Sequence, residues 1–176
     1  FPVFQAVVNS IHSIDEREKK DANFVRSNGR IIVSILRSSV QNLYDNSKPE
    51  IIGFKISDNG IGFTDDNYES FKTLDSEYKM DIGCRGVGRL LWLKAYKQVK
   101  VQSVFQAGEI LKKRVFDFNI SKDIHNEGLE EVSSIGVGTE VALNEIGKNY
   151  KDYIPKTAGT IANALLEHCL WYFIRE

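Results

Sequence analysis

The sequence predicts an α+β fold, a two-layer sandwich in which helices cover one face of a mixed, largely antiparallel sheet. Helical periodicity occurs at both ends of the chain, whereas segments with strand character form separate runs between them. A glycine-rich stretch without strong periodicity, residues 58–89, separates these runs. The length of 176 residues corresponds to one domain, and a hydrophobic content of 42% is enough for a sizeable core. We therefore expect a single domain over residues 1–176.

The first half of the chain predicts a helix followed by a hairpin. Apolar side chains recur at helical spacing over residues 3–14, and the charged run at residues 15–20 is expected to be the solvated end of this helix. Two segments rich in Ile and Val, residues 30–36 and 50–57, predict strands. A turn signal at residues 46–49 lies between them, so the two strands are expected to pair as a hairpin.

The second half predicts further helices and strands around the glycine-rich stretch. Each assignment follows from the period of the apolar residues, which is helical in some segments and strand-like in others. The expected elements are a short helix over residues 66–74, a helix over 87–96, strands over 98–105, 110–120 and 139–143, and a long apolar helix over 160–173.

Composition and charge disfavour several classes of function. The formal net charge is −1, whereas nucleic-acid binders usually have a strong basic excess, so we expect no direct nucleic-acid binding. No run of about 18 apolar residues predicts a membrane span. The two cysteines, Cys84 and Cys169, form neither a disulfide framework nor a metal-ligand pattern. We expect a cytoplasmic domain with reduced thiols, and the first residue, Phe1, suggests a piece of a longer protein.

The most informative motif is the segment Asp58-Asn59-Gly60-Ile61-Gly62. A predicted strand delivers Asp58 directly into a turn with two glycines. Glycine allows positive φ and lets the backbone approach a ligand closely. A carboxylate at a strand end can accept a hydrogen bond from an amino group such as that of adenine. An ordinary hairpin turn is the alternative reading of the same residues.

A second glycine motif, Gly83-Cys84-Arg85-Gly86-Val87-Gly88, precedes the predicted helix near Val87. Backbone N–H groups at a helix N-terminus, together with the helix dipole, favour anions. The motif therefore has the physical features of a phosphate site. It is neither a Rossmann fingerprint nor a Walker A loop, because no short strand leads into it and no Gly-Lys-Ser/Thr follows. A simple loop remains the alternative.

Two weaker signals lie near the two ends of the chain. Gln5 and Asn9 are four residues apart and share one face of the first predicted helix. Asn9 could offer its amide oxygen to Mg²⁺, which prefers oxygen ligands, although a pair of surface amides is the alternative. Thr139 follows Gly138 at the start of a predicted strand and offers a hydroxyl there.

In their order along the chain, these four motifs resemble those of the GHKL superfamily, named for gyrase, heat-shock chaperones, histidine kinases and MutL. The ATP site of that superfamily is known as the Bergerat fold, and the resemblance spans nearly the whole chain. It implies that Asn9 ligates Mg²⁺ and that Asp58, Gly60 and Gly62 form the adenine motif. It also assigns the phosphates to the second glycine motif and the adenine end to Thr139. The residues it places around the phosphates are Gly83, Arg85, Gly86, Val87 and Gly88, and for Arg85 a surface salt bridge is the alternative.

The resemblance also implies an ATP lid over about residues 63–86. Lys79 lies where some members carry a lid lysine near the phosphates, and a solvated loop lysine is the alternative. The expected cofactors are ATP and Mg²⁺. The expected partners are an adenine nucleotide, further domains of the same protein and a second copy in a nucleotide-dependent dimer.

Gln5 departs from the pattern of the hydrolysing members, which carry a glutamate four residues before the Mg²⁺ asparagine. That glutamate is the general base for the attacking water, and an amide cannot take up the proton; losing a general base typically slows a reaction by about 10²–10⁴. Two explanations stay open, a natural glutamine with slow or absent hydrolysis, or an engineered replacement of glutamate.

The sequence thus predicts Mg-dependent ATP binding, used as a conformational switch in a larger protein, with slow hydrolysis in the native family. A histidine-kinase-type catalytic domain and a non-hydrolysing ATP sensor are the alternatives. The late segment Gly138-Thr139 fits the ATPase and kinase classes equally well.

Overall fold

A computed structural model of the protein describes residues 2–39, 48–73, 88–133 and 135–174. These residues form five α-helices, one short 3₁₀ segment and a six-stranded sheet. The elements are α1 (Pro2–Lys20), η1 (Arg26–Asn28), β1 (Ile31–Arg37), β2 (Ile51–Asp58), α2 (Asp65–Lys72), α3 (Gly88–Ala95), β3 (Tyr96–Ala107), β4 (Ile110–Asn119), β5 (Asp123–Val132), β6 (Gly138–Ile146), α4 (Lys148–Lys151) and α5 (Ala158–Ile174).

The sheet has the strand order β1-β2-β6-β3-β4-β5, and every pairing is antiparallel. The expected hairpin of the first two strands is confirmed. The expectation of a mixed sheet is wrong for the described strands, because none of them pairs in parallel. Strand β6 is the last in sequence but lies in the centre, between β2 and β3. In this position, residues 139–144 of β6 pair with residues 53–58 of β2.

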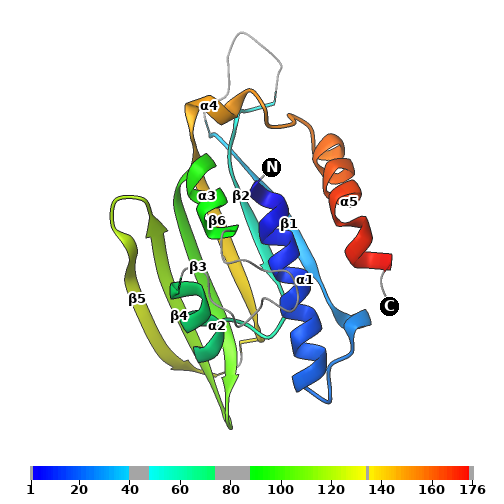
Figure 1. The fold of residues 1–176 in the computed structure, drawn as a ribbon, viewed down its shortest axis with the longest axis vertical. Coiled ribbons are helices and arrows are strands. Elements are labelled where there is room, and N and C mark those ends of the chain that lie inside the picture. Colours follow the sequence, from blue (N-terminus) through cyan, green and yellow to red (C-terminus); the bar gives the residue numbers. More distant parts are fainter. Residues whose placement is uncertain (1, 40–47, 74–87, 134, 175–176) are drawn as a thin grey trace.

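Helices cover one face of this sheet, as Figure 1 shows, with α1 lying between α3 and α5 in front of the strands. The buried strand residues alternate and point toward the helices, for example Phe54 and Ile56 on β2 and Val99 and Val101 on β3. The opposite face carries charged pairs, including Lys55 with Glu140 at 3.2 Å. This arrangement is α+β and compatible with the expected two-layer sandwich.

Strand β5 was not predicted, and neither was the single-turn helix α4. The sequence of β5, DIHNEGLEEV, lacks the apolar alternation of a half-buried strand. It forms the edge of the sheet and is largely exposed, so charged residues are tolerated on both of its faces. Its pairing with β4 therefore depends on backbone hydrogen bonds rather than on a hydrophobic pattern.

Aromatic side chains fill the core between α2, α3 and β4. Phe71 packs against Phe116 with ring centroids 5.3 Å apart, and against Trp92 at 6.4 Å. Trp92 and Tyr96 are each only 1% exposed, so both are core residues. Because Phe71 belongs to α2, this cluster fixes the helix that follows the Asp58 turn onto the sheet.

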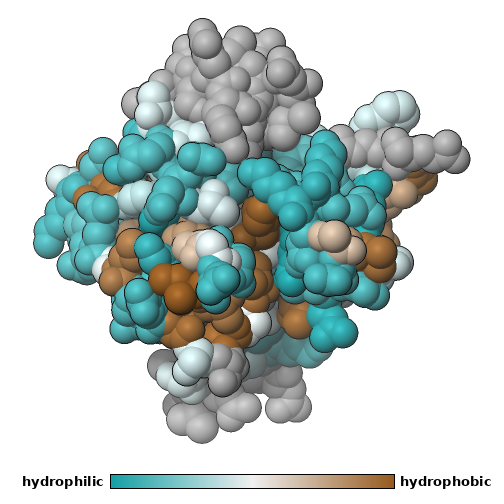
Figure 2. All heavy atoms as spheres, turned by 90° about the horizontal axis from the view of Figure 1, so that it is seen from below, coloured by the Kyte–Doolittle hydropathy of each residue, from teal (hydrophilic) through white to brown (hydrophobic). Residues whose placement is uncertain are grey.

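The surface is mainly polar, and exposed apolar side chains concentrate on α5. On the face that Figure 2 shows, most of the coloured atoms are hydrophilic and the hydrophobic ones gather near the middle. Of the residues in α5, Ile161 and Cys169 are buried. None of the described helices combines the length and apolar character needed to cross a bilayer. The exposed apolar residues of α5, each between 54% and 69% exposed, are Leu166, Leu170, Trp171, Phe173 and Ile174.

Arg114 on β4 connects the sheet to the chain segment between β2 and α2. Its guanidinium donates to the carbonyl oxygens of Phe63 and Thr64, both at 2.9 Å, and forms an ion pair with Asp65. The guanidinium carbon also lies 4.4 Å from the ring centroid of Tyr68. Arg114 is 6% exposed, so its hydrogen bonds to the two carbonyl groups are made away from water, where charged hydrogen bonds contribute most.

We predict that Arg114→Met destabilises the protein by about 2–4 kcal/mol, because two carbonyl groups lose charged hydrogen-bond donors. The control is Asp65→Asn, which removes the same ion pair from its exposed side and is expected to cost less than about 1 kcal/mol. Urea unfolding followed by circular dichroism measures both. Equal losses in the two variants would show that the ion pair, and not the carbonyl contacts, holds this segment.

Candidate functional site

The candidate site lies where α1 meets the turn after β2. Three residues of α1 at helical spacing contact this turn. The Ser10 hydroxyl donates to Asp58 Oδ2 at 2.8 Å, and the Arg17 guanidinium donates to the Asn59 carbonyl at 2.8 Å. The carbonyl of Ser13 accepts a hydrogen bond from the N–H of Ile61 at 3.0 Å. One face of α1 thus fixes the position of the Asp58 motif.

The Asp58 carboxyl group is enclosed by protein, although the residue as a whole is partly exposed. It accepts the Ser10 hydroxyl on one oxygen and the N–H of Gly60, at 2.9 Å, on the other. Burial raises the pKa of Asp58 to about 6, because the charged carboxylate loses solvation. Hydrogen bonds from Ser10, Gly60 and Thr139 lower the pKa in part. A desolvated acceptor of this kind is suited to a ligand that brings a hydrogen-bond donor.

The glycines of the turn are required by close packing. A Cβ atom at Gly60 would lie 2.3 Å from Ser13 Oγ. Gly62 has φ +83° and a Cβ there would lie 2.5 Å from the carbonyl oxygen of Val104. The turn is not a two-residue hairpin turn, because β2 is followed by α2 and pairs with β1 and β6. The hairpin alternative for this motif is therefore wrong.

Thr139 is brought next to Asp58 by the register of the central strands. Asp58 pairs with Thr139 across β2 and β6, and Ser103 pairs with Thr139 across β3 and β6. The hydroxyl groups of Ser103 and Thr139 lie 2.9 Å apart. Ser103 Oγ also accepts the N–H of Phe63 at 2.8 Å. The buried Ser103 thus joins the Gly138-Thr139 segment to the chain that leaves the Asp58 turn.

Gln5 and Asn9 lie on the same face of α1, as expected, and contact each other. The side-chain amide of Gln5 donates to Asn9 Oδ1 at 3.0 Å. Asn9 is exposed and is adjacent in sequence to Ser10, which holds Asp58. The Asn9 oxygen therefore lies in reach of solvent, next to the helix face that carries the Asp58 contacts.

The expected phosphate-binding residues fall mostly beyond the part of the chain that the structure describes. Gly88 begins α3, which packs beside α1 on the helical face of the sheet. Of the expected lid, residues 63–73 are described, and they include α2, which is anchored in the core. The expected site residues outside the described ranges are Lys79, Gly83, Arg85, Gly86 and Val87.

Sequence reasoning did not identify Ser10, Arg17 and Ser103 as contributors to this site. A signal exists for two of them. Ser10 interrupts the apolar pattern of α1, and Ser103 occupies an inward position of β3 between Val101 and Phe105. A small polar residue on an apolar face must find a hydrogen-bond partner, and such interruptions indicate where a polar site enters the core.

The described residues include no group of three or more His, Cys, Asp or Glu side chains that could hold a metal ion by itself. A single amide oxygen such as that of Asn9 could serve Mg²⁺ only together with water or phosphate oxygens. That is the usual coordination of Mg²⁺ at nucleotide sites, so the residues present fit a metal that arrives with a nucleotide.

Comparisons with known proteins add no family to this geometry. No protein-family model matches the chain, and no curated protein matches it.

The raised pKa of Asp58 predicts a specific pH dependence of stability. The pKa of Asp58 is about 6 in the folded protein and 3.8 in the unfolded chain. At pH values between these two, the chain therefore takes up a proton when it folds. The free energy of unfolding should therefore fall by up to about 3 kcal/mol from pH 4 to pH 7 through this group. Asp58→Asn removes this titration. The free energy of unfolding of the variant, taken relative to that of the wild type, should therefore increase as the pH rises. Parallel pH profiles in urea unfolding would contradict the burial of this carboxylate.

Proposed function

We propose that the chain is a GHKL-type ATP-binding domain with a Bergerat-type site. The observation that supports this most directly is the Asp58 carboxyl group, desolvated at the end of a central strand and held by Ser10 from α1. Thr139 lies beside it in the register of β2 and β6. Two of the four sequence motifs, those of Asp58 and Thr139, are therefore neighbours at one end of the sheet, and Asn9 is next in sequence to Ser10, which holds Asp58.

In this proposal the Asp58 carboxylate accepts a hydrogen bond from the 6-amino group of adenine. The two Asp58 oxygens already accept three hydrogen bonds, from Ser10, Gly60 and the backbone of Thr139, and a carboxylate offers about four acceptor sites. Gly60 and Gly62 keep the turn close to α1 and β3, where any side chain at these two positions would clash. The ligand's donor would offset the cost of desolvating Asp58.

Asn9 would hold Mg²⁺ together with the phosphates, and the N-terminus of α3 at Gly88 would lie toward the phosphates. A helix N-terminus offers N–H groups and a favourable dipole to an anion. The Asn9 oxygen accepts from Gln5 in the free protein, so this hydrogen bond must open before the oxygen can ligate the metal. The magnesium ion would supply charge neutralisation of the phosphates when bound.

Gln5 occupies the position of the general base and lowers the expected rate of hydrolysis. Its amide cannot accept the proton of an attacking water, and its N–H₂ group also engages the Asn9 oxygen. Because of Gln5, the domain would hydrolyse ATP slowly or only sense it. ATP binding would then act as a conformational switch for attached domains or a second copy. Phosphoryl transfer to a histidine, which needs no such glutamate, is the second candidate because of Gln5.

The first test is binding of ATP with Mg²⁺ by calorimetry to the wild type and to Asp58→Asn. The amide cannot replace the charged acceptor, so we expect a loss of about 1–3 kcal/mol, or roughly 5- to 150-fold in affinity. Asp152→Asn, an exposed site remote in the chain, is the matched control and should bind as the wild type does. No binding by the wild type, or equal affinity for Asp58→Asn, would contradict the proposal.

The second test restores the general base. Gln5→Glu should raise single-domain ATP turnover by about 10²-fold or more, because glutamate can accept the proton and no longer donates to Asn9 Oδ1. Gln5→Met, which has neither a proton acceptor nor an amide donor, is the control and should leave turnover at the wild-type level. A rise in Gln5→Met equal to that in Gln5→Glu would show that freeing Asn9, rather than base catalysis, limits the reaction.

A further inference from the structure

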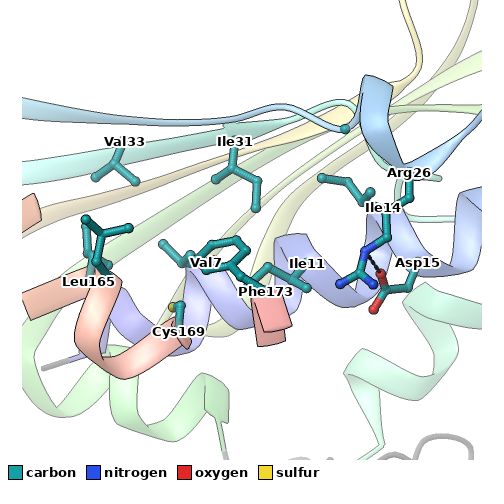
Figure 3. A pocket seen from close by; sticks show the side chains of 12 residues that line it. Val7, Ile11, Ile14, Asp15, Arg26, Ile31, Val33, Leu165, Cys169 and Phe173 are labelled. Atoms are coloured by element: carbon teal, nitrogen blue, oxygen red, sulfur yellow. Dashed lines mark ion pairs between the residues drawn. The ribbon is translucent and has the colours of Figure 1, made fainter. Parts of the chain in front are cut away.

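A groove lies between α1, β1 and α5 (Figure 3), and Figure 1 shows α5 on the side of α1 away from α3. Helix α5 leans on α1, where Phe4 stacks on His168 with ring centroids 4.4 Å apart and His12 meets Tyr172 edge-on at 5.6 Å. Over β1 the cover is incomplete, since Ile31 and Val33 are only partly buried. The α5 groove is defined by Val7 and Ile11 of α1, Ile31 and Val33 of β1, and Leu165 and Cys169 of α5.

The α5 groove has the size and lining of a small-molecule site. Its volume is about 350 Å³. An apolar cavity of about 150 Å³ already accommodates benzene, and ligand pockets typically measure about 300–1,000 Å³. This volume cannot enclose a helix of a partner protein, because such a helix is about 10 Å in diameter. It fits a compact molecule of one or two rings.

The polar groups of the groove restrict the ligand further. Asp15 and Arg26 form an ion pair at one end, with Arg26 Nε 3.1 Å from Asp15 Oδ1, and Figure 3 shows both side chains beside Ile14. Arg26 also donates to the carbonyl of Tyr172 at 2.8 Å, which ties α5 to this end. The pair has no net charge but presents an anionic acceptor and a cationic donor. A neutral hydroxyl group can donate to Asp15 and accept from Arg26, whereas a carboxylate can only accept and would place a second anion beside Asp15.

We propose that the α5 groove binds a small neutral aromatic alcohol, with its ring between β1 and α5 and its hydroxyl at the Asp15–Arg26 pair. The bound ring would supply the contacts that α5 lacks over Ile31 and Val33. This site is distinct from the proposed nucleotide site and does not depend on it, because the groove lies against Val7 and Ile11, whereas Ser10 and Arg17 face the Asp58 turn.

The test measures binding of 2-naphthol to the free protein by saturation-transfer NMR, with no nucleotide present. We expect a Kd of about 0.1–1 mM, as is usual for a ligand of this size, and at least about ten-fold weaker binding of 2-naphthoate. Val33→Phe fills the floor of the groove and should weaken 2-naphthol binding at least about ten-fold. Leu170→Gln, on the exposed face of the same helix, should change it less than about two-fold.

A second variant tests the polar end without filling the groove. Asp15→Asn removes the repulsion of a carboxylate and should reduce the preference for 2-naphthol over 2-naphthoate to about two-fold or less. Equal binding by wild type and folded Val33→Phe, or loss of binding in Leu170→Gln, would place the ligand elsewhere and overturn the proposal. Absence of saturable binding by the wild type would also overturn it, while ATP binding measured separately would leave the proposed function standing.

Discussion

The candidate site depends on one buried carboxyl group, that of Asp58. An ionised carboxylate away from water is unfavourable unless donors compensate it, and the donors come from three separate parts of the chain. Ser10 reaches from α1, Gly60 from the turn itself, and Thr139 from the central strand β6. The three donors lower the pKa only in part, so they do not fully compensate the carboxylate for its lost hydration. A further hydrogen-bond donor from a ligand would therefore stabilise the ionised carboxylate at this position.

Helix α1 is the element that makes this arrangement possible, because its different faces serve different tasks. Val7 and Ile11 face the core and the α5 groove, Ser10 and Arg17 hold the Asp58 turn, and Asn9 is exposed. A rigid helix keeps these positions fixed relative to one another. A change in the rotation of α1 would alter the Asp58 contacts and the groove together.

The helices and most strands could be predicted from the sequence, because their apolar periods are local properties. The strand end and turn at Asp58 could also be predicted locally, since a strand runs directly into two glycines, whereas its role as a ligand site stays a prediction. Register could not be predicted, because Asp58 and Thr139 pair across a separation of about eighty residues and β6 enters the sheet centre last. Arg114 and Ser103 act through such pairings, and β5 is held at the edge without an apolar pattern. The contacts that could not be predicted from the sequence are thus those between residues far apart in the chain.

The central claim is that Asp58 recognises the amino group of adenine, and the affinity for ATP against that for ITP tests it most directly. Inosine carries an oxygen acceptor where adenine has its amino donor, and the two nucleotides otherwise share ribose and triphosphate. With Mg²⁺ at pH 8, where Asp58 is ionised, the account predicts that ATP binds at least about ten-fold more tightly than ITP, the scale of one charged hydrogen bond. Equal affinities for the two nucleotides would contradict it.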